Sequence, residues 1–491
     1  MAIRVLDVLN FSNLRNPEAD SGVRLQKELL TAILQKRPDF FFYLLIPHEL
    51  KSSYETCFAG KNVQLIPCSV ATRQQGGAYD FNARELSAIL DLRRIDVDVL
   101  FINQPELTPA FLEFFNKVHF FDIHSFGYIH WMDWKRADNI KNRWNLPSNL
   151  SLLTSILLST MTGCNSRYGR ERILREAAKW FNPSALREIE KKLIPLWPGI
   201  NCAEILAART RARHGLKTIV FPCRTQKYTG FKSLVEIHLA GLWRKRRDFR
   251  LLLTNPSDYD YVKHYPRRFP FVEVCRLNRQ EYLGALWMAD IVVGCHTGAN
   301  QWSLGVVEAM AAECIPLLNK SSFFDEMLSA VVPLREREEM SKRYFYYRQA
   351  FANRLENLLD NLEHERKRAR LLGQRIRDFY SWERRVDQWI QCFEAADAAS
   401  PSITVRSRMM RQIERFVSRK RKCSKASILN FLSWHPKSRH ISWTKYRKRL
   451  RECFVEVPGS ALVVFVRRKK VRPRISRWGA GSSARIQGRT G

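Results

Sequence analysis

The sequence predicts an α/β protein with two doubly wound parallel-sheet domains that face a cleft, followed by a small, basic and mainly helical C-terminal module. Apolar runs typical of buried strands alternate with helical stretches through the first 400 residues. A segment rich in Pro and Gly, 193–201, divides this alternation into two series and is expected to be an interdomain linker. Near residue 400 the composition changes to a basic tail.

The first series begins with an expected strand at 3–9. Asp20-Ser21-Gly22 then predicts the start of a helix, because Asp is a favoured N-cap. Further strands are expected at 40–46, 63–67, 97–102 and 118–122, and helices at 84–93 and 109–116.

The second series has expected strands at 218–221, 249–254, 272–274, 291–293 and 315–318. A highly charged helical stretch follows at 341–397, with Trp382 and Trp389 as its expected anchors. The predicted divisions of the chain are 1–200, 201–398, a basic module at 403–475 and a disordered tail at 476–491.

Charge is distributed unevenly along the chain. Residues 401–491 hold 25 Lys and Arg against 3 Asp and Glu, which is +22 of the formal +34. This asymmetry favours a polyanionic partner, either nucleic acid or an acidic membrane face, over a merely solvated basic tail. The longest mild apolar stretch, 152–158, is too short to span a membrane.

The cysteine pattern and the N-terminal segment indicate the cellular compartment in which the protein is expected. The 11 cysteines include no C-x-x-C pair and many lie in apolar runs, which predicts reduced, buried thiols and no zinc site. Residues 1–9 are too short and too charged for a secretory signal. We therefore expect a cytoplasmic protein, in the host cytoplasm if the chain is viral.

The most informative segment lies around Glu308. The expected strand 291–294 leads through a small polar turn into a helix N-terminus, which attracts phosphate. Glu308 lies one to two turns into this helix, where a carboxylate can accept hydrogen bonds from both hydroxyls of a ribose. The residues predicted to line a nucleotide-sugar site here are His296, Thr297, Gly298, Asn300 and Glu308. The alternative is an amphipathic helix with Glu308 at its solvated edge.

This segment resembles the second half of the E-x7-E motif of retaining GT-B glycosyltransferases, the family that includes glycogen and sucrose synthases and α-mannosyltransferases. The position of that family's first Glu holds Asn300, an amide that can hydrogen-bond a sugar but carries no charge. Over residues 1–395 the resemblance implies a GT-B fold, a nucleotide-sugar donor such as UDP-glucose, retention, and neither a metal nor another cofactor. It also implies that helices in 341–397 cross back onto the first domain, and that the Gly22 backbone lies along the cleft.

A group of cations follows the expected strand 219–223. The resemblance implies that Arg224 and a nearby Lys neutralise the leaving diphosphate in place of a metal ion. In the family the Lys precedes a Gly, but Thr229 precedes Gly230 here, so the Lys is either Lys227 or Lys232. Three cations on one short loop could instead be solvated surface.

Two further groups are expected in the cleft. The loop before helix 279–288 usually touches the nucleobase in this family, which makes Arg279 and Leu277 the candidates. On the acceptor side, the resemblance implies that His130 or His124 contacts the transferred sugar. The other expected acceptor residues are Trp131, Asp133 and Trp134, whose indoles could stack a base or a sugar. The alternative is an aromatic core with a satisfied histidine.

The basic tail predicts helices at 425–434 and 444–450 and a strand at 461–470, a pattern similar to a helix-turn-helix DNA-binding module. The cations expected to contact phosphates are Lys445, Arg447, Lys448 and Arg451. The alternative is a basic helix on an anionic membrane surface.

Together these features predict a metal-independent hexosyltransferase that modifies nucleic acid, with a 5-hydroxymethylpyrimidine in viral DNA, such as bacteriophage 5-hydroxymethylcytosine, as the favoured acceptor. Two other transferase acceptors were weighed: a lipid-linked or envelope glycan at the membrane surface, and a modified tRNA base. A different class remains open, a nucleic-acid-binding protein with an inactive transferase domain.

Overall fold

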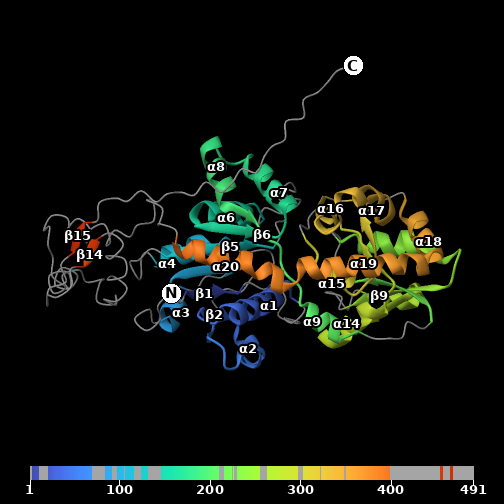
Figure 1. Ribbon diagram of the computed structural model, residues 1–491, viewed down its shortest axis with the longest axis horizontal. Coiled ribbons are helices and arrows are strands. Elements are labelled where there is room, and N and C mark those ends of the chain that lie inside the picture. Colours follow the sequence, from blue (N-terminus) through green and yellow to red (C-terminus); the bar gives the residue numbers. More distant parts are fainter. Residues whose placement is uncertain are drawn as a thin grey trace, which may run out of the picture. The chain divides into compact units, whose positions relative to one another are not determined.

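The computed structural model describes residues 3–9, 20–68, 83–90, 97–103, 105–115, 123–130, 145–209, 215–223, 225, 229–254, 262–296, 302–320, 322–347, 350–398, 454–456 and 465–467. The chain divides into two compact units, of which the larger comprises Met1–Val118 and Asp122–Val405. This unit contains both of the sheets that the sequence predicts (Figure 1).

The first sheet has seven strands in the order β3-β2-β1-β4-β5-β6-β7, and every neighbouring pair is parallel. Its strands are β1 Arg4–Val8, β2 Phe41–Ile46, β3 Val63–Pro67, β4 Val99–Asn103, β5 His124–Ile129, β6 Met161–Cys164 and β7 Leu193–Pro195. The helices between them are α1 Ser21–Lys36, α2 Lys51–Phe58, α3 Ala83–Ile89, α4 Thr108–Phe114, α6 Asn145–Leu158, α7 Arg167–Ala177 and α8 Pro183–Lys192. The strand order reverses between β1 and β4, and ligands bind at such a switch point, outside the carboxyl ends of the strands.

The second sheet has six parallel strands in the order β10-β9-β8-β11-β12-β13. They are β8 Lys217–Phe221, β9 Phe249–Thr254, β10 Val272–Cys275, β11 Ile291–Gly294, β12 Ile315–Asn319 and β13 Phe345–Tyr346. The helical segments around them are α9 Cys202–Ala207, α10 Phe231–Ser233, η7 Leu234–Leu239, α11 Ala240–Trp243, α13 Tyr265–Arg268, α14 Arg279–Met288, α15 Leu304–Ala311, α16 Ser322–Ser329, α17 Arg337–Tyr344 and α18 Phe351–Asp360. Here the order reverses between β8 and β11.

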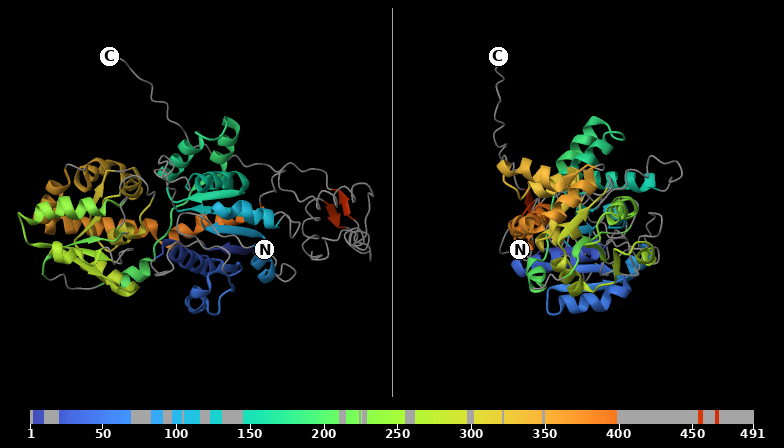
Figure 2. Two further views of the ribbon diagram at one scale, coloured as in Figure 1. Left: turned by 180° about the vertical axis from the view of Figure 1, so that it is seen from behind. Right: turned by 90° about the vertical axis from the view of Figure 1, so that its right-hand side faces the viewer.

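Two long helices close the unit and join its halves. Helix α19 (Leu362–Tyr380) packs on the second sheet, whose core includes Ile376 and Tyr380. Helix α20 (Trp382–Ala398) lies along the first sheet (Figures 1 and 2). Its Trp389 and Phe393 pack into the core of that sheet. The predicted crossing back onto the first domain is therefore confirmed, with Trp382 and Trp389 both buried.

The two crossings between the sheets lie against each other. Ile200, in the first crossing, donates its N–H to the Tyr380 carbonyl at 2.8 Å and accepts from the Trp382 N–H at 3.2 Å. A Cβ on Gly199 would lie 2.4 Å from the Trp382 ring, so only glycine fits at this contact. The chain thus passes twice between the sheets through one tight, paired junction.

Two predicted elements differ from the structure, and a third, the strand at 118–122, lies outside the described residues. The next described strand is β5, His124–Ile129. The linker expected at 193–201 begins with β7, the last strand of the first sheet. The stretch 341–397 is divided into α17, β13, α18, α19 and α20, because Phe345–Tyr346 pairs with β12 as an edge strand.

In the smaller unit the structure describes one antiparallel pair, β14 (Phe454–Glu456) and β15 (Phe465–Arg467). Strand β15 falls inside the strand predicted at 461–470, whereas the two predicted helices lie outside the described residues. Within the described parts of the chain, no helix is long and apolar enough to span a membrane. No disulfide links the nine cysteines that the structure describes.

Candidate nucleotide-sugar site

Buried polar side chains follow three neighbouring strands of the second sheet. Thr225 comes after β8, Thr254 ends β9 and His296 follows β11, and all three are buried. Their side-chain atoms Thr225 Oγ1, Thr254 Oγ1 and His296 Nδ1 have no hydrogen-bond partner among the described residues. Since the carboxyl ends of parallel strands meet at one edge, these groups line the edge of the sheet at its switch point. Buried polar atoms need partners, so this edge is suited to a polar ligand.

His296 presents a neutral imidazole at this edge. Burial lowers the pKa of His296 to about 4, so the ring is uncharged at neutral pH. The ring packs against Phe323 and Phe324, with centroid distances of 6.0 and 5.7 Å. A neutral imidazole held in this way can donate or accept one hydrogen bond without adding charge to the site.

Helix α15 begins beside the end of β8. A Cβ on Gly305 would lie 2.4 Å from the Pro222 carbonyl oxygen, so a side chain at this position would push the helix away. The close approach brings Glu308, in the second turn, to the interior of the unit, where it is fully buried. The alternative of a Glu308 at a solvated helix edge is therefore wrong.

The Glu308 carboxylate binds two arginines and a tyrosine. Arg24 of α1 donates to both carboxylate oxygens, with Nη1 at 2.8 Å from Oε2. Arg279 of α14 donates its Nη2 to Oε1 at 2.7 Å, and the Tyr282 hydroxyl donates to Oε2 at 3.2 Å. Because Arg24 belongs to the half that holds the first sheet and Glu308 to the half that holds the second, this carboxylate links the two halves of the unit.

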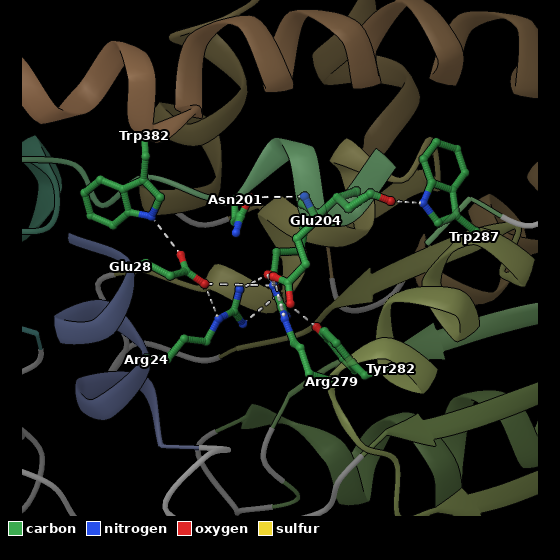
Figure 3. A network of polar contacts seen from close by, with 10 residues as sticks. Arg24, Glu28, Asn201, Glu204, Arg279, Tyr282, Trp287 and Trp382 are labelled. Atoms are coloured by element: carbon green, nitrogen blue, oxygen red, sulfur yellow. Dashed lines mark hydrogen bonds and ion pairs between the residues drawn. The ribbon is translucent and has the colours of Figure 1, made fainter. Parts of the chain in front are cut away.

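Two further carboxylates extend the network, as Figure 3 shows. Glu28 accepts from Arg24 Nε at 2.9 Å and from the Trp382 indole N–H at 2.7 Å. Glu204, in α9, accepts from Arg279 Nε at 3.1 Å and from its Nη2 at 3.0 Å. The five charged residues thus comprise two arginines and three carboxylates, a formal charge of −1.

Arg279 lies in this network, at the start of α14. Burial and the neighbouring Arg24 charge lower the pKa of Arg279 from its ordinary value. Its Nη1 is buried and has no acceptor among the described residues. The predicted contact of Arg279 and Leu277 with a nucleobase stays a prediction, and Nη1 is the donor that is available for it.

The opposing edge, on the first sheet, carries a second polar chain. The His130 Nε2 bonds to the Asn103 side-chain oxygen, and Asn103 Nδ2 donates to the Gly22 carbonyl at 3.3 Å. The His130 carbonyl accepts from the Asn165 side chain. These contacts fix His130 at the carboxyl end of β5, beside the start of α1 and near the switch point of the first sheet.

The structure separates the two candidate histidines. His124 is the first residue of β5 and His130 follows its last, so they lie at opposite ends of a strand about 16 Å long. The carboxyl end is the ligand-binding edge. We therefore retain His130 as the acceptor-side candidate and correct the expectation for His124, which is buried at the other edge.

Of the predicted diphosphate cations, only Lys232 is described. It lies exposed on α10 and pairs with Glu236 at 3.9 Å. The other predicted site residues outside the described parts of the chain are Arg224, Lys227, Thr297, Gly298, Asn300, Trp131, Asp133, Trp134, Lys445, Arg447, Lys448 and Arg451.

Several polar residues of the site were not predicted from the sequence. They are Arg24, Glu28, Glu204, Thr225, Thr254 and Tyr282. Thr225 and Thr254 follow apolar strands, a signal that could have indicated them. Arg24 and Glu204 look like ordinary solvated helix residues in the sequence, and only the approach of distant elements shows their role.

Comparison with solved structures defines the class of fold. A glycosyltransferase from Rickettsia africae ESF-5 matches with a TM-score of 0.56 at 12% identity, covering 81% of this chain and 99% of that one. Anabaena HepE in complex with UDP-glucose matches with a TM-score of 0.55 at 12% identity, covering 79% and 99%. Sucrose-phosphate synthase from Thermosynechococcus elongatus matches with a TM-score of 0.55 at 13% identity, covering 81% and 100%.

The fold is therefore GT-B, as the sequence predicts, and it extends over the whole length of these similar structures. No protein-family model matches the sequence, and no curated protein matches it either.

Proposed function

We propose that this protein is a glycosyltransferase that uses a nucleotide sugar as donor. The observation that carries the proposal is the edge of the second sheet at its switch point, where Thr225, Thr254 and His296 present buried polar atoms without partners among the described residues. In an open parallel sheet this is where a nucleotide binds. The likeness in fold to HepE, whose complexes contain UDP and UDP-glucose, supports the assignment.

In this proposal the two sheets have separate tasks. The nucleotide lies on the second sheet, with its ribose toward Glu308 and its diphosphate at the loop after β8, where Arg224 is expected to offset the charge that develops on the leaving group. His130 lies on the first sheet and is expected to contact the transferred sugar. Its bond to Asn103 orients the ring for this contact.

For the acceptor we propose nucleic acid, with a 5-hydroxymethylpyrimidine in viral DNA as the favoured base. The support is the charge of residues 401–491, where 25 Lys and Arg stand against 3 Asp and Glu. Such a segment binds phosphates and releases counterions, which makes its affinity fall steeply with salt. A glycan at an anionic membrane surface is the competing acceptor, and the same cations would bind anionic lipid.

The first experiment tests the donor. Full-length protein is incubated with UDP-, GDP- and ADP-hexoses, and hydrolysis and binding are measured for wild type and His296→Phe. Phenylalanine keeps the packing against Phe323 and Phe324 but removes Nδ1, so we expect donor affinity to fall roughly five- to tenfold, as for one lost hydrogen bond. His264→Phe, at an exposed position outside the site, is the matched control. No binding of any of these nucleotide sugars to the wild type would refute the proposed function and favour an inactive transferase domain.

The second experiment tests the acceptor. Hydroxymethylated duplex DNA and anionic vesicles carrying a lipid-linked glycan are offered with the bound donor, and modified nucleosides and glycans are measured by mass spectrometry. Removal of residues 401–491 should abolish salt-dependent DNA binding while leaving donor hydrolysis in place. Transfer to the glycan but not to DNA would overturn the nucleic-acid acceptor and leave the glycosyltransferase assignment standing.

A further inference from the structure

The carboxylate expected to hold the donor ribose is already occupied. Glu308 Oε1 accepts from Arg24 and Arg279, and Oε2 accepts from Arg24 and Tyr282. Two carboxylate oxygens provide about four acceptor sites in total. All four are used by the protein, so a ribose hydroxyl can bond to Glu308 only if one of these donors leaves.

Arg24 is the donor best placed to leave. Arg279 and Tyr282 are on α14, which belongs to the same sheet domain as α15, whereas Arg24 is on α1 of the other sheet domain and lies 284 residues away in sequence. Arg24 also keeps a second carboxylate, Glu28, one turn along its own helix at 2.9 Å. After losing Glu308, its guanidinium would therefore not be left without a counterion.

Displacing Arg24 from Glu308 leaves the attachment of the two domains intact. They remain joined at the paired crossings around Ile200 and Ser381 and through α20 in the core of the first sheet, so a small relative movement would be taken up at these crossings. Hinge motions of this kind are absorbed by a few residues at element ends.

We propose that Arg24 is a gating residue of the donor site, which holds Glu308 in the empty protein and is displaced from it by the ribose of the nucleotide. The proposal rests on the proposed function, because it takes the ligand of Glu308 to be a nucleotide ribose. In the empty protein Arg24 competes with the ribose for Glu308 and therefore weakens nucleotide binding. Binding of the donor in turn releases the Arg24–Glu308 contact between the two sheet domains.

The test uses Arg24→Met in the full-length chain, with UDP, GDP and ADP as probes and the 2′,3′-dideoxy form of whichever binds. Methionine keeps apolar bulk, and Glu308 retains Arg279 and Tyr282, so the variant is expected to fold. We expect nucleotide affinity to rise roughly tenfold, because the ribose no longer has to displace the charged hydrogen bonds of Arg24 from Glu308. The affinity for the dideoxy nucleotide should change much less, because it has no ribose hydroxyls to offer Glu308.

A readout without nucleotide completes the test. Hydrogen exchange in segments 21–30 and 302–311 of the empty protein should be faster in Arg24→Met than in the wild type, since the contact between α1 and α15 is lost. Arg37→Met, which removes ion pairs to Asp39 and Glu394 at the other end of α1, is the matched control. Nucleotide that binds the wild type but binds Arg24→Met equally or more weakly would refute the gate and leave the proposed function intact. Failure of all three nucleotides to bind the wild type would refute both.

Discussion

Replacing Glu308 by Gln should destabilise the larger unit, and the structure sets the size of the effect. The side chain is fully buried and accepts from Arg24, Arg279 and Tyr282. The amide keeps one oxygen acceptor but turns an NH2 donor toward guanidinium groups that are themselves donors. Removing one partner of a buried ion pair costs about 3–5 kcal/mol when it leaves a charge uncompensated.

The expected loss is smaller than in that range, because each arginine keeps a second carboxylate. Arg24 retains Glu28 and Arg279 retains Glu204. We expect a loss of about 2–4 kcal/mol in the free energy of unfolding. Urea unfolding followed by tryptophan fluorescence measures it, and the Trp382 indole, which donates to Glu28, lies in the same network.

Double-mutant cycles measure the Arg24–Glu308 and Arg279–Glu308 interactions separately. Arg24→Met and Arg279→Met are each combined with Glu308→Gln, and the coupling energy of each pair is obtained from the four unfolding curves. Both couplings should exceed about 0.5 kcal/mol, the value expected for interacting buried neighbours. A Glu308→Gln protein as stable as the wild type, with additive double mutants, would show that the network contributes nothing and would refute the reasoning.

Three other outcomes follow from the structure. Burial raises the pKa of Asp7 to about 8, so its protonated form is favoured in the folded state, and the stability it contributes below pH 4 is lost as pH rises toward 8. Asp7→Asn should therefore gain stability over the wild type at pH 8, with the gain shrinking toward pH 5 in thermal unfolding scans. Gly305→Ala places a Cβ 2.4 Å from the Pro222 carbonyl, and both a lower melting temperature and weaker nucleotide binding by calorimetry are expected, in contrast to Gly284→Ala, which meets nothing within 4 Å. Transfer should persist in EDTA, because cations of the protein are expected to offset the diphosphate charge, and a requirement for Mg²⁺ or Mn²⁺ in the activity assay would contradict this.

Strands with long apolar runs were predictable, and those that depend on distant contacts were not. Strand β2 is a continuous run of Phe, Tyr, Leu and Ile, and its prediction needs no partner. Strand β5 contains Gly127, whose backbone lies against Pro105 with only 2.8 Å available for a Cβ, so its sequence does not look like a buried strand. Strand β7 ends in Pro195, which is a turn signal in sequence and an edge-strand residue in the sheet.

The residues of the candidate site also differ in whether local sequence could indicate them. Glu308 could be proposed as a site residue from the sequence because a local pattern, a strand, a polar turn and a helix, surrounds it, and its role in a donor site stays a prediction. Arg24 was not, because its neighbours Val23 and Leu25 give an ordinary amphipathic helix in which an arginine looks solvated. What makes it a site residue is an element 284 positions away, and no local pattern encodes that approach.

The contacts that hold the two sheet domains together differ in kind, and the difference indicates which of them can break. Helix α20 is anchored in the core of the first sheet by large apolar side chains, and exposing them would cost the hydrophobic free energy of each. Other contacts between the two halves include polar pairs, beside apolar ones such as Tyr168 of α7 against Phe323 of α16. Arg24 meets Glu308 on one side, and Glu326 of α16 accepts from the Arg167 and Tyr168 backbone N–H groups at the start of α7, at 2.8 and 2.7 Å. The backbone N–H groups that bind Glu326 can be rehydrated at a small net cost, whereas the buried Arg24–Glu308 pair is costly to break unless a ligand takes the place of Arg24. The apolar attachment through α20 and the polar contact at Glu308 are therefore made by different residues, so the proposed displacement of Arg24 leaves the apolar attachment in place.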